Sequence, residues 1–284
     1  MPKLRLITDT NASLPAELIE KFQIVEVPIH IQFGEDSYKT GVEIDDQKLF
    51  EMIDERNELP TTAAPSPADF SQAYQRVMDE GADQIICICC SSTVSAIFNA
   101  AQIAAEMHPD WGITVVDSKQ LSLAEGFQVI AAAKAALAGA EKEEILTLVE
   151  DLQTRMRVFG ALPTLKYLAM GGRMGRLAAG LGETLAIKPI LESNEGKLEL
   201  LEKVRTWKKA KQRLIELAVE STSGKKVEQV GMVHVNNEEG VRSLFTSLKN
   251  ALGFDVDPLY TEFTPGLSVH TGSGVIAYVL VTES

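Results

Sequence analysis

Cysteine is scarce in this chain, and its placement excludes two kinds of structure. The 284 residues contain three cysteines, Cys87, Cys89 and Cys90, which all lie in one apolar stretch. Three cysteines this close together cannot form a disulfide framework, and they do not have the ligand spacing of a zinc site. We therefore expect buried, reduced thiols that pack as small apolar side chains.

Long apolar runs and excess positive charge are also missing. No apolar stretch approaches the roughly 20 residues that span a bilayer. The first residues, MPKLR, lead straight into a strand pattern without the features of a signal peptide. Together these observations predict a cytoplasmic protein. The formal net charge of −13 argues against nucleic acid as a general partner.

Familiar catalytic motifs are absent as well. The sequence has no Walker phosphate loop, no GxGxxG after a strand, no GxSxG elbow and no group of His, Cys and acidic residues with metal-ligand spacing. Asp9 and Asp117 each follow a predicted strand, where turn-forming roles are their ordinary use. The pattern favours binding over turnover, so we expect neither an enzyme nor a bound cofactor or metal.

The order of predicted elements indicates an α/β protein of two domains. Apolar strands alternate with helical segments over the first half, which is typical of a parallel sheet covered on both faces. From about residue 158 the pattern changes to strands around a turn at residues 193–196, a basic helix and a final strand at residues 274–281. We predict an N-terminal parallel α/β domain at 1–158 and a C-terminal α/β domain with a mixed or antiparallel sheet at 159–284.

One predicted strand is followed at once by a group of hydroxyls. Residues 85–90 are continuously apolar, and Ser91, Ser92, Thr93 and Ser95 come directly after them, before a predicted helix at residues 96–107. Ligands of open α/β sheets bind beyond the carboxyl ends of strands, and a helix N-terminus suits an oxyanion such as a carboxylate or phosphate. Because serine and threonine are also ordinary helix N-caps, the segment alone leaves both interpretations open.

Two further loops and a basic region are candidates for ligand contacts. Residues 60–66 are rich in proline and threonine, and His270 is followed by Thr271 and Gly272 before the last strand. Six basic residues with no acidic residue among them follow in the second half, and they are Lys203, Arg205, Lys208, Lys209, Lys211 and Arg213. Arg173, in a glycine-rich loop, and Arg205 lie outside regular helix in this interpretation. We consider them candidates for contact with a phosphate or an acidic partner.

Taken together, these motifs resemble the DegV family of bacterial lipid-binding proteins, which includes the fatty-acid-binding subunit of fatty acid kinase. The resemblance covers essentially the whole chain. Its markers are TDT at 8–10, TAAPS at 62–66, SSTVS at 91–95, VDS at 116–118, LKYL at 165–168, GGR at 171–173, KPIL at 188–191, KVR at 203–205 and HTG at 270–272.

The resemblance implies a fold, a ligand and a partner. It implies two α/β domains with a long-chain fatty acid buried in an apolar tunnel between them. The carboxylate would be held by Thr62, Ser92 and His270. Ser91, Ser95, Thr271 and Gly272 belong to the same motifs, which leaves open which serine contacts the ligand.

The resemblance also implies what happens to the bound ligand. A separate ATP-dependent kinase would phosphorylate the fatty acid, with Arg173 and Arg205 near the kinase-facing mouth, and the protein would carry the acyl phosphate away. Transient contact with a membrane belongs to the same set of expectations.

Two other functions stay open on the sequence. Dihydroxyacetone kinase subunits have a related fold and use a histidine on a small carbonyl substrate, so His270 could serve a kinase or transferase component of that type. A compact, polar site would then be expected, rather than an apolar tunnel. A regulatory ligand sensor with no phosphorylation step is the third hypothesis.

Overall fold

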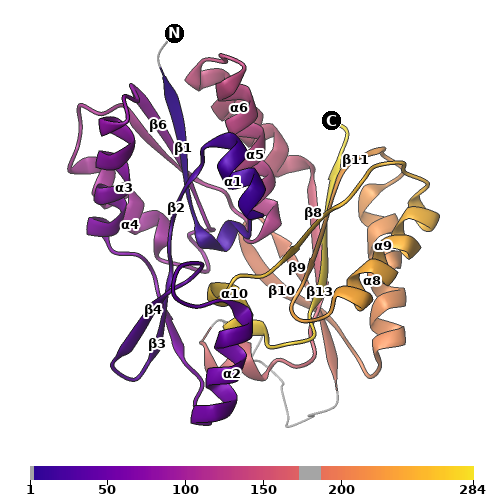
Figure 1. Cartoon of the computed structure of the whole chain (residues 1–284). Coiled ribbons are helices and arrows are strands. Elements are labelled where there is room, and N and C mark those ends of the chain that lie inside the picture. The colour runs from indigo at the N-terminus through magenta and orange to yellow at the C-terminus, as the bar shows by residue number, and fades with distance from the viewer. Residues whose placement is uncertain (1–2, 173–186) are drawn as a thin grey trace.

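The structure is a computed structural model that describes residues 3–172 and 187–284. Within these ranges the chain forms two larger sheets flanked by helices and one small sheet, as Figure 1 shows. The larger sheets lie side by side, and the small sheet projects from one end of the first. This arrangement confirms the predicted α/β class, with a parallel sheet in the N-terminal part and a mixed sheet in the C-terminal part.

The first sheet is parallel, with the strand order β2-β1-β6-β7. Its strands are β1 (Leu4–Asp9), β2 (Val25–Val27), β6 (Gln84–Cys89) and β7 (Ile113–Asp117). Alternate side chains of β6 enter different cores. Ile85, Cys87 and Cys89 pack against α3 (Pro67–Asp79) and α4 (Ile97–Glu106), whereas Ile86 and Ile88 pack toward α5 (Leu123–Leu137). This explains the continuously apolar sequence of the strand. Its thiols are buried and free.

The second sheet has six strands in the order β10-β9-β8-β13-β11-β12, and only β11 and β12 pair in parallel. Its strands are β8 (Met156–Ala161), β9 (Lys188–Asn194), β10 (Lys197–Val204), β11 (Val227–His234), β12 (Leu259–Glu262) and β13 (Ile276–Thr282). One face is covered by α8 (Trp207–Thr222) and α9 (Glu238–Leu252).

Helix α5 lies between the two larger sheets and holds them together. Its first eleven residues are almost entirely buried, which matches their mostly apolar sequence, in which Glu125 and Gln128 are the polar residues. Gly231 of β11 allows this approach, because a Cβ there would come within 2.8 Å of Leu123. The remaining helices of the first part are α1 (Ala16–Phe22) and α6 (Lys142–Arg155).

The third sheet is antiparallel, with the order β4-β3-β5, and it carries one helix. It consists of β3 (His30–Phe33), β4 (Asp36–Lys39) and β5 (Thr61–Ala63), with α2 (Asp46–Arg56) beside it. The short helix α10 (Pro265–Thr271) reaches over from the C-terminal part and places Val269 in the same core as Ile31 and Leu49. Figure 1 shows α10 between α2 and the six-stranded sheet.

Three predicted elements differ from the structure. The alternating residues 24–33 predict a single strand. They form two strands, β2 and β3, in two different sheets, because Pro28 has no N–H to continue a ladder and the chain turns there. The loop predicted at 60–66 contains β5. The histidine loop predicted at 270–274 begins two residues later, since His270 and Thr271 end α10.

We propose that the two-domain division runs between α6 and β8. The predicted boundary after residue 158 falls inside β8, all of which belongs to the second sheet. Residues 3–172 and 187–284 contain no helix that is both long and apolar enough to cross a membrane.

Candidate functional site

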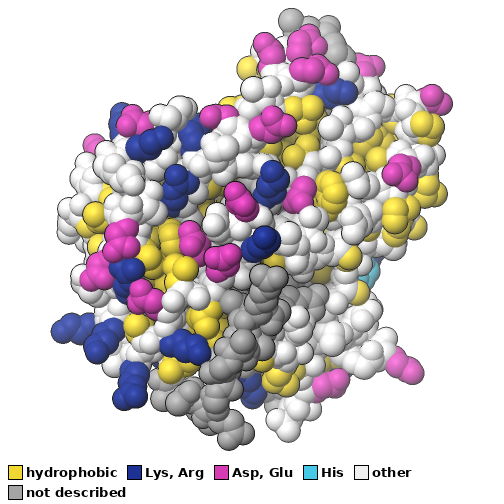
Figure 2. Space-filling view, turned by 180° about the vertical axis from the view of Figure 1, so that it is seen from behind, with side chains coloured by type: hydrophobic (Ala, Val, Ile, Leu, Met, Phe, Trp, Pro, Cys, Tyr) yellow, Lys and Arg dark blue, Asp and Glu magenta, His cyan; other side chains and the backbone are white. Residues whose placement is uncertain are grey.

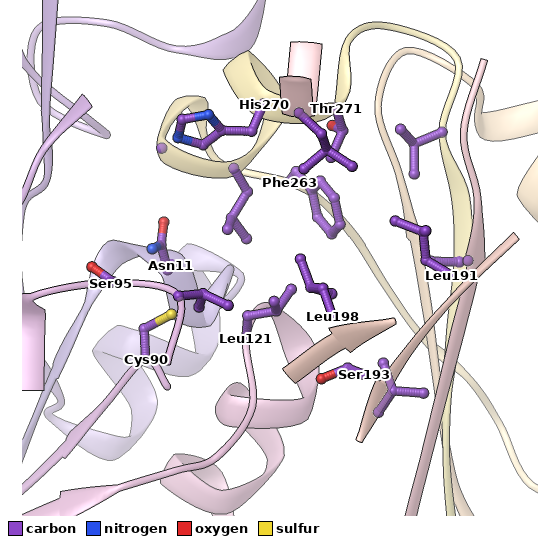
Figure 3. A pocket seen from close by; sticks show the side chains of 18 of the residues that line it. Asn11, Cys90, Ser95, Leu121, Leu191, Ser193, Leu198, Phe263, His270 and Thr271 are labelled. Atoms are coloured by element: carbon purple, nitrogen blue, oxygen red, sulfur yellow. The ribbon is translucent and has the colours of Figure 1, made fainter. Parts of the chain in front are cut away.

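A cavity of about 320 Å³ lies between the carboxyl ends of the parallel strands and the inner face of the six-stranded sheet. Its volume falls in the range of about 300–1,000 Å³ that is common for small-molecule sites. Apolar side chains from both parts of the chain form most of its wall, including Ile97, Leu121, Leu168, Leu191, Leu198 and Phe263. Figure 3 shows several of these side chains pointing into the space below α10.

The polar groups of the cavity include a direct contact between Thr62 and His270. The Thr62 hydroxyl lies 3.0 Å from Nε2 of His270, and both residues line the cavity. Thr62 comes from β5, where it pairs with Ile31 of β3, and His270 comes from the last turn of α10. The small sheet and α10 therefore bring together two predicted site residues from opposite ends of the chain.

Glycine makes room for the imidazole ring. A Cβ at position 171 would overlap Nδ1 of His270, so any larger residue there would displace the ring. Gly171 ends α7 (Lys166–Met170), whose Leu168 lines the cavity. The segment at residues 165–172, which contains two of the predicted motifs, thus packs against the ring of His270.

The serine loop after β6 contributes one of its three serines to the described cavity wall. Ser95 lines the cavity together with its neighbours Val94, Ala96 and Ile97. Its Oγ accepts a hydrogen bond of 3.3 Å from the backbone N–H of Ile97, near the start of α4. A hydroxyl that accepts this bond still carries a hydrogen that it can donate to a carboxylate.

The other two serines of this loop have different partners. Ser92 is exposed, and its hydroxyl donates to Asp117 Oδ2 at 2.5 Å. Ser91 is buried and donates to the carbonyl of Gly196 at 2.8 Å, and the Thr93 hydroxyl donates to the same carbonyl. Of these three serines, it is Ser95 that lines the cavity together with Thr62 and His270.

The contact at Gly196 fastens the β9–β10 hairpin to the N-terminal part. Ser193, at the end of β9, adds a hydrogen bond of 2.8 Å from its hydroxyl to Gln120 Oε1. Since Leu191, Ser193 and Leu198 all line the cavity, these bonds hold one wall of it in place. This role of Ser91 and Thr93 was not predicted from the sequence, because Gly196 lies more than 100 positions away in the chain.

The residues after His270 shape the site in different ways. Thr271 lines the cavity, and its hydroxyl donates to the Ser268 carbonyl at 3.4 Å. Gly272 has a φ of +78°, and a Cβ there would overlap the Tyr167 ring. Glycine is needed at 272 for backbone conformation and for space.

The two arginines predicted to face a partner cannot both be placed. Arg173 lies outside the described residues. Arg205 is exposed, between β10 and α8. Figure 2 shows a group of Lys and Arg side chains on this side of the molecule, and exposed Lys203, Lys208 and Lys209 lie nearby in sequence. Arg213 instead forms ion pairs within the protein, with Glu202, Glu216 and Glu220.

The comparisons with known proteins agree with this architecture. A sequence profile of the DegV family, described as a family of uncharacterised proteins, matches residues 3–283. The chain belongs to the DegV family. It is 33% identical over 275 residues to a DegV domain-containing protein of Streptomyces coelicolor, and the match covers 97% of each chain.

Solved structures of DegV proteins have the same fold. A DegV family protein of Thermus thermophilus, described as binding fatty acid, superposes with a TM-score of 0.92 at 29% identity and 100% coverage of both chains. DegV of Bacillus subtilis, described as a fatty acid binding protein, gives a TM-score of 0.88 at 29% identity, again with 100% coverage of both.

Behind the cavity, this DegV chain buries two facing carboxyl groups. Asp9 ends β1, and its carboxylate accepts hydrogen bonds from the backbone N–H groups of Asn11 at 3.0 Å and Cys90 at 2.9 Å. Burial raises the pKa of Asp9 to about 6. Burial, with the nearby charge of Asp9, raises the pKa of Glu125 on α5 well above its usual value. These shifts favour the neutral form of Glu125 beside the Asp9 carboxylate.

The role of this carboxyl pair in the DegV chain is structural. Asp9 positions the two loops that carry Asn11 and Cys90, and both of these residues line the cavity. Asp117 does the same for the serine loop, since it accepts from the backbone of Lys119 and from Ser92. These are the turn-forming roles expected for the two aspartates. Within the described residues, no group of three or more His, Cys, Asp or Glu side chains is arranged to hold a metal ion.

Asn11 is a polar cavity residue that was not predicted from the sequence. It follows the TDT motif in the short 3₁₀ helix η1 (Thr10–Ala12), and it is 6% exposed. An asparagine beside a strand end is usually a turn residue, so its sequence position carried no signal that its side chain enters a cavity.

Proposed function

We propose that this DegV-family protein binds a long-chain fatty acid in the cavity between its two larger sheets. The observation that carries the proposal is an apolar cavity with hydrogen-bonding side chains that include the Thr62–His270 pair and Ser95. An alkyl chain with one polar end matches this distribution. The fatty-acid binding described for the Thermus thermophilus and Bacillus subtilis relatives supports the same ligand class.

The apolar wall supplies most of the binding free energy in this proposal. Each methylene group that leaves water contributes about 0.8 kcal/mol. A chain of roughly 16 carbons gains on the order of 10 kcal/mol before the cost of ordering the ligand. Side chains such as Leu191, Leu198 and Phe263 provide this surface.

The head group determines the class of lipid. A buried carboxylate costs several kcal/mol unless it is hydrogen-bonded. The hydroxyls of Thr62 and Ser95 can donate to it without adding a net charge, and His270 can donate from its ring. We assign the serine contact to Ser95 because it lines the cavity, whereas Ser92 is exposed and bonded to Asp117.

In the proposed role, the protein is a carrier for a separate enzyme and does not itself convert its ligand. It would present the carboxylate to an ATP-dependent kinase and carry away the acyl phosphate. Arg205 and the exposed lysines near it provide a basic surface for an acidic partner. Arg173 remains a sequence-based prediction for the same surface.

The apolar wall favours this proposal over the small-carbonyl alternative. A kinase or transferase component that acts through His270 on a compact polar substrate would need polar groups around most of its site. Here, apolar side chains from β8, β9, β10 and α4 surround the space next to His270.

Lipid extraction tests the binding step. The purified protein would be denatured and examined by mass spectrometry, and the delipidated protein would be titrated with hexadecanoic acid. We expect an acyl chain in the extract and saturable binding at one site. Failure of both experiments would reject a fatty acid as the ligand.

A coupled assay tests the carrier step. The loaded protein would be incubated with ATP and a fatty acid kinase catalytic subunit, and acyl phosphate would be measured. Arg205→Ala should lower the rate of acyl phosphate formation and leave lipid affinity unchanged. Lipid binding without acyl phosphate from the wild type would instead support a ligand sensor.

A further inference from the structure

The Asn11 carboxamide presents a polar atom to the cavity wall without a protein partner. Its Oδ1 is buried and has no hydrogen-bond partner in residues 3–172 and 187–284. Asn11 lines the same cavity as Thr62, Ser95 and His270. Figure 3 shows the carboxamide on the side of the cavity that holds Ser95 and the His270 ring, with Leu191 on the opposite side.

The protein reserves space for this carboxamide. Gly266, in the first turn of α10, lies against it, and a Cβ at position 266 would come within 2.6 Å of Oδ1. Hydrogen bonds between backbone and side chains fix the segment, since the N–H of Asn11 donates to the Asp9 carboxylate and the Ser13 hydroxyl donates to the Asn11 carbonyl. The side chain is therefore held toward the cavity by the η1 turn and is not excluded by α10.

Cys90 allows the carboxamide to present either end to a ligand. The thiol of Cys90 interacts with the Asn11 side chain, and a thiol is both a weak donor and a weak acceptor. Rotation of the carboxamide by 180° exchanges its oxygen and nitrogen with little change in shape. The contact with Cys90 can survive this rotation, which then directs the Nδ2 hydrogens into the cavity.

We propose that Asn11 is a contact for the ligand's carboxylate, which its Nδ2 group binds alongside Thr62, Ser95 and His270. This inference rests on the proposed function, because it assumes a ligand with a carboxylate at this end of the cavity. A buried polar group without a partner is costly. In the rotated carboxamide the Cys90 thiol donates to Oδ1 and the ligand's carboxylate accepts from Nδ2, so both polar ends have a partner. Asn11 thereby selects a carboxylate over an uncharged head group.

Asn11→Leu tests the proposal, with hexadecanoic acid and hexadecan-1-ol as matched probes. Leucine has a similar size and cannot form hydrogen bonds. Loss of a hydrogen bond to a charged group should weaken binding of the acid by about 10- to 100-fold. The loss for the alcohol should be smaller, because its bond to Asn11 is uncharged. The melting temperature of the ligand-free variant should change little, since the substitution removes an unpaired buried oxygen along with a weak contact to the Cys90 thiol.

Two further variants separate a head-group contact from a general packing effect. Leu198→Ala, on the apolar wall, should weaken the acid and the alcohol equally. Asn11→Asp keeps the shape but repels a carboxylate and can still accept from an alcohol, so it should shift the preference toward the alcohol.

Equal losses of both probes in Asn11→Leu, or no loss of either, would overturn the role of Asn11. If the wild-type protein binds neither probe, the proposed function itself fails. If it binds the acid normally and Asn11→Leu does too, only this inference fails.

Discussion

The contact between Thr62 and His270 joins side chains that are 208 positions apart in the chain. Neither residue is held by its own element alone. Thr62 depends on the pairing of β5 with β3, and His270 depends on the packing of α10 against that small sheet and against Gly171. The distance between the two side chains therefore depends on how α10 packs. A substitution that removes one hydroxyl should change ligand binding alone, whereas one that moves α10 should also change stability.

Thr62→Val should weaken fatty-acid binding with little effect on folding. Valine has nearly the same shape and a high strand propensity, but it cannot donate a hydrogen bond. We expect an affinity loss of about 10- to 100-fold for hexadecanoic acid, measured by titration of delipidated protein. The exposed neighbour Thr61 supplies the matched control, and Thr61→Val should bind like the wild type. Similar losses in both variants would contradict a direct role for the Thr62 hydroxyl.

The serine loop gives a second prediction at the scale of single residues. Ser95→Ala removes a hydroxyl that lines the cavity, whereas Ser92→Ala removes one that bonds Asp117 at the surface. Ser95→Ala should therefore lower affinity by about 10-fold or more. Ser92→Ala should leave affinity close to that of the wild type. The reverse order of effects would restore Ser92 as the carboxylate contact.

The sequence predicts those site residues that belong to local motifs, and it does not predict those whose role depends on contacts between distant parts of the chain. The TAAPS and HTG motifs identified Thr62 and His270, because each motif is local and resembles a family pattern. The choice among Ser91, Ser92 and Ser95 depended on which element each hydroxyl meets. Ser91 meets a hairpin tip 105 positions away, and nothing near Ser91 in the sequence indicates that contact.

Among the helices and strands, the length of an element determines whether its sequence pattern predicts it. The six-residue strand β6 and the fifteen-residue helix α9 carry enough apolar periodicity to be found from the sequence. The three residues of β5 and the seven of α10 do not, because tertiary packing stabilises them more than their own sequence does. These two short elements are the ones that position Thr62 and His270.

The β9–β10 hairpin is the element that closes the cavity wall. Its turn places Glu195 at a φ of +46° and Gly196 at +82°, and positive φ at two central residues suits the twist of a tight hairpin. The Gly196 carbonyl then accepts from Ser91 and Thr93. The turn conformation and the contact between the two parts of the protein thus depend on the same glycine.

Gly196→Ala should loosen this wall more than a matched glycine substitution elsewhere. A Cβ at 196 would lie 2.6 Å from Ser91 Oγ. Gly224 has a similar φ of +78°, and the described residues leave open space around a Cβ there. Both variants share the backbone strain, so the clash should cost Gly196→Ala about 1–3 kcal/mol more stability than Gly224→Ala.

Denaturant unfolding and a ligand-dissociation assay provide the measurements for the hairpin. The Gly196 variant should also release fatty acid faster, because the clash pushes the hairpin away from the serine loop. Equal destabilisation and equal release rates in the two variants would show that the hairpin contact does not retain the ligand.

For the whole molecule, carboxyl groups buried at the parallel sheet and beside the small sheet make stability depend on pH. Burial raises the pKa of Asp9 to about 6, of Asp46 to about 7 and of Glu26 to about 8, and it raises that of Glu125 well above its usual value. The ordinary values for these groups are 3.8 or 4.5, so the folded state binds these protons more tightly than the unfolded state does. Their contribution to stability is complete below about pH 4 and is lost as the pH rises through 6 to 8.

Glu125→Gln should remove part of this pH dependence. Glutamine resembles the protonated acid, and its carbonyl can still accept from the Thr8 hydroxyl, which lies 3.1 Å from Glu125 Oε1. Calorimetry of the delipidated wild type should give a lower melting temperature at pH 8 than at pH 5, and the variant should show a smaller difference. In a chain somewhat smaller than this one, a change of 1 kcal/mol in the free energy of unfolding shifts the melting temperature by about 2–4 °C.

The exposed Glu150 on α6 provides the control, because Glu150→Gln removes a carboxylate without removing a buried one. It should keep the pH dependence of the wild type. If Glu125→Gln keeps it as well, Glu125 does not hold its proton in the folded state. The Asp9–Glu125 pair would then not be the reason why the protein is more stable at low pH than at high pH.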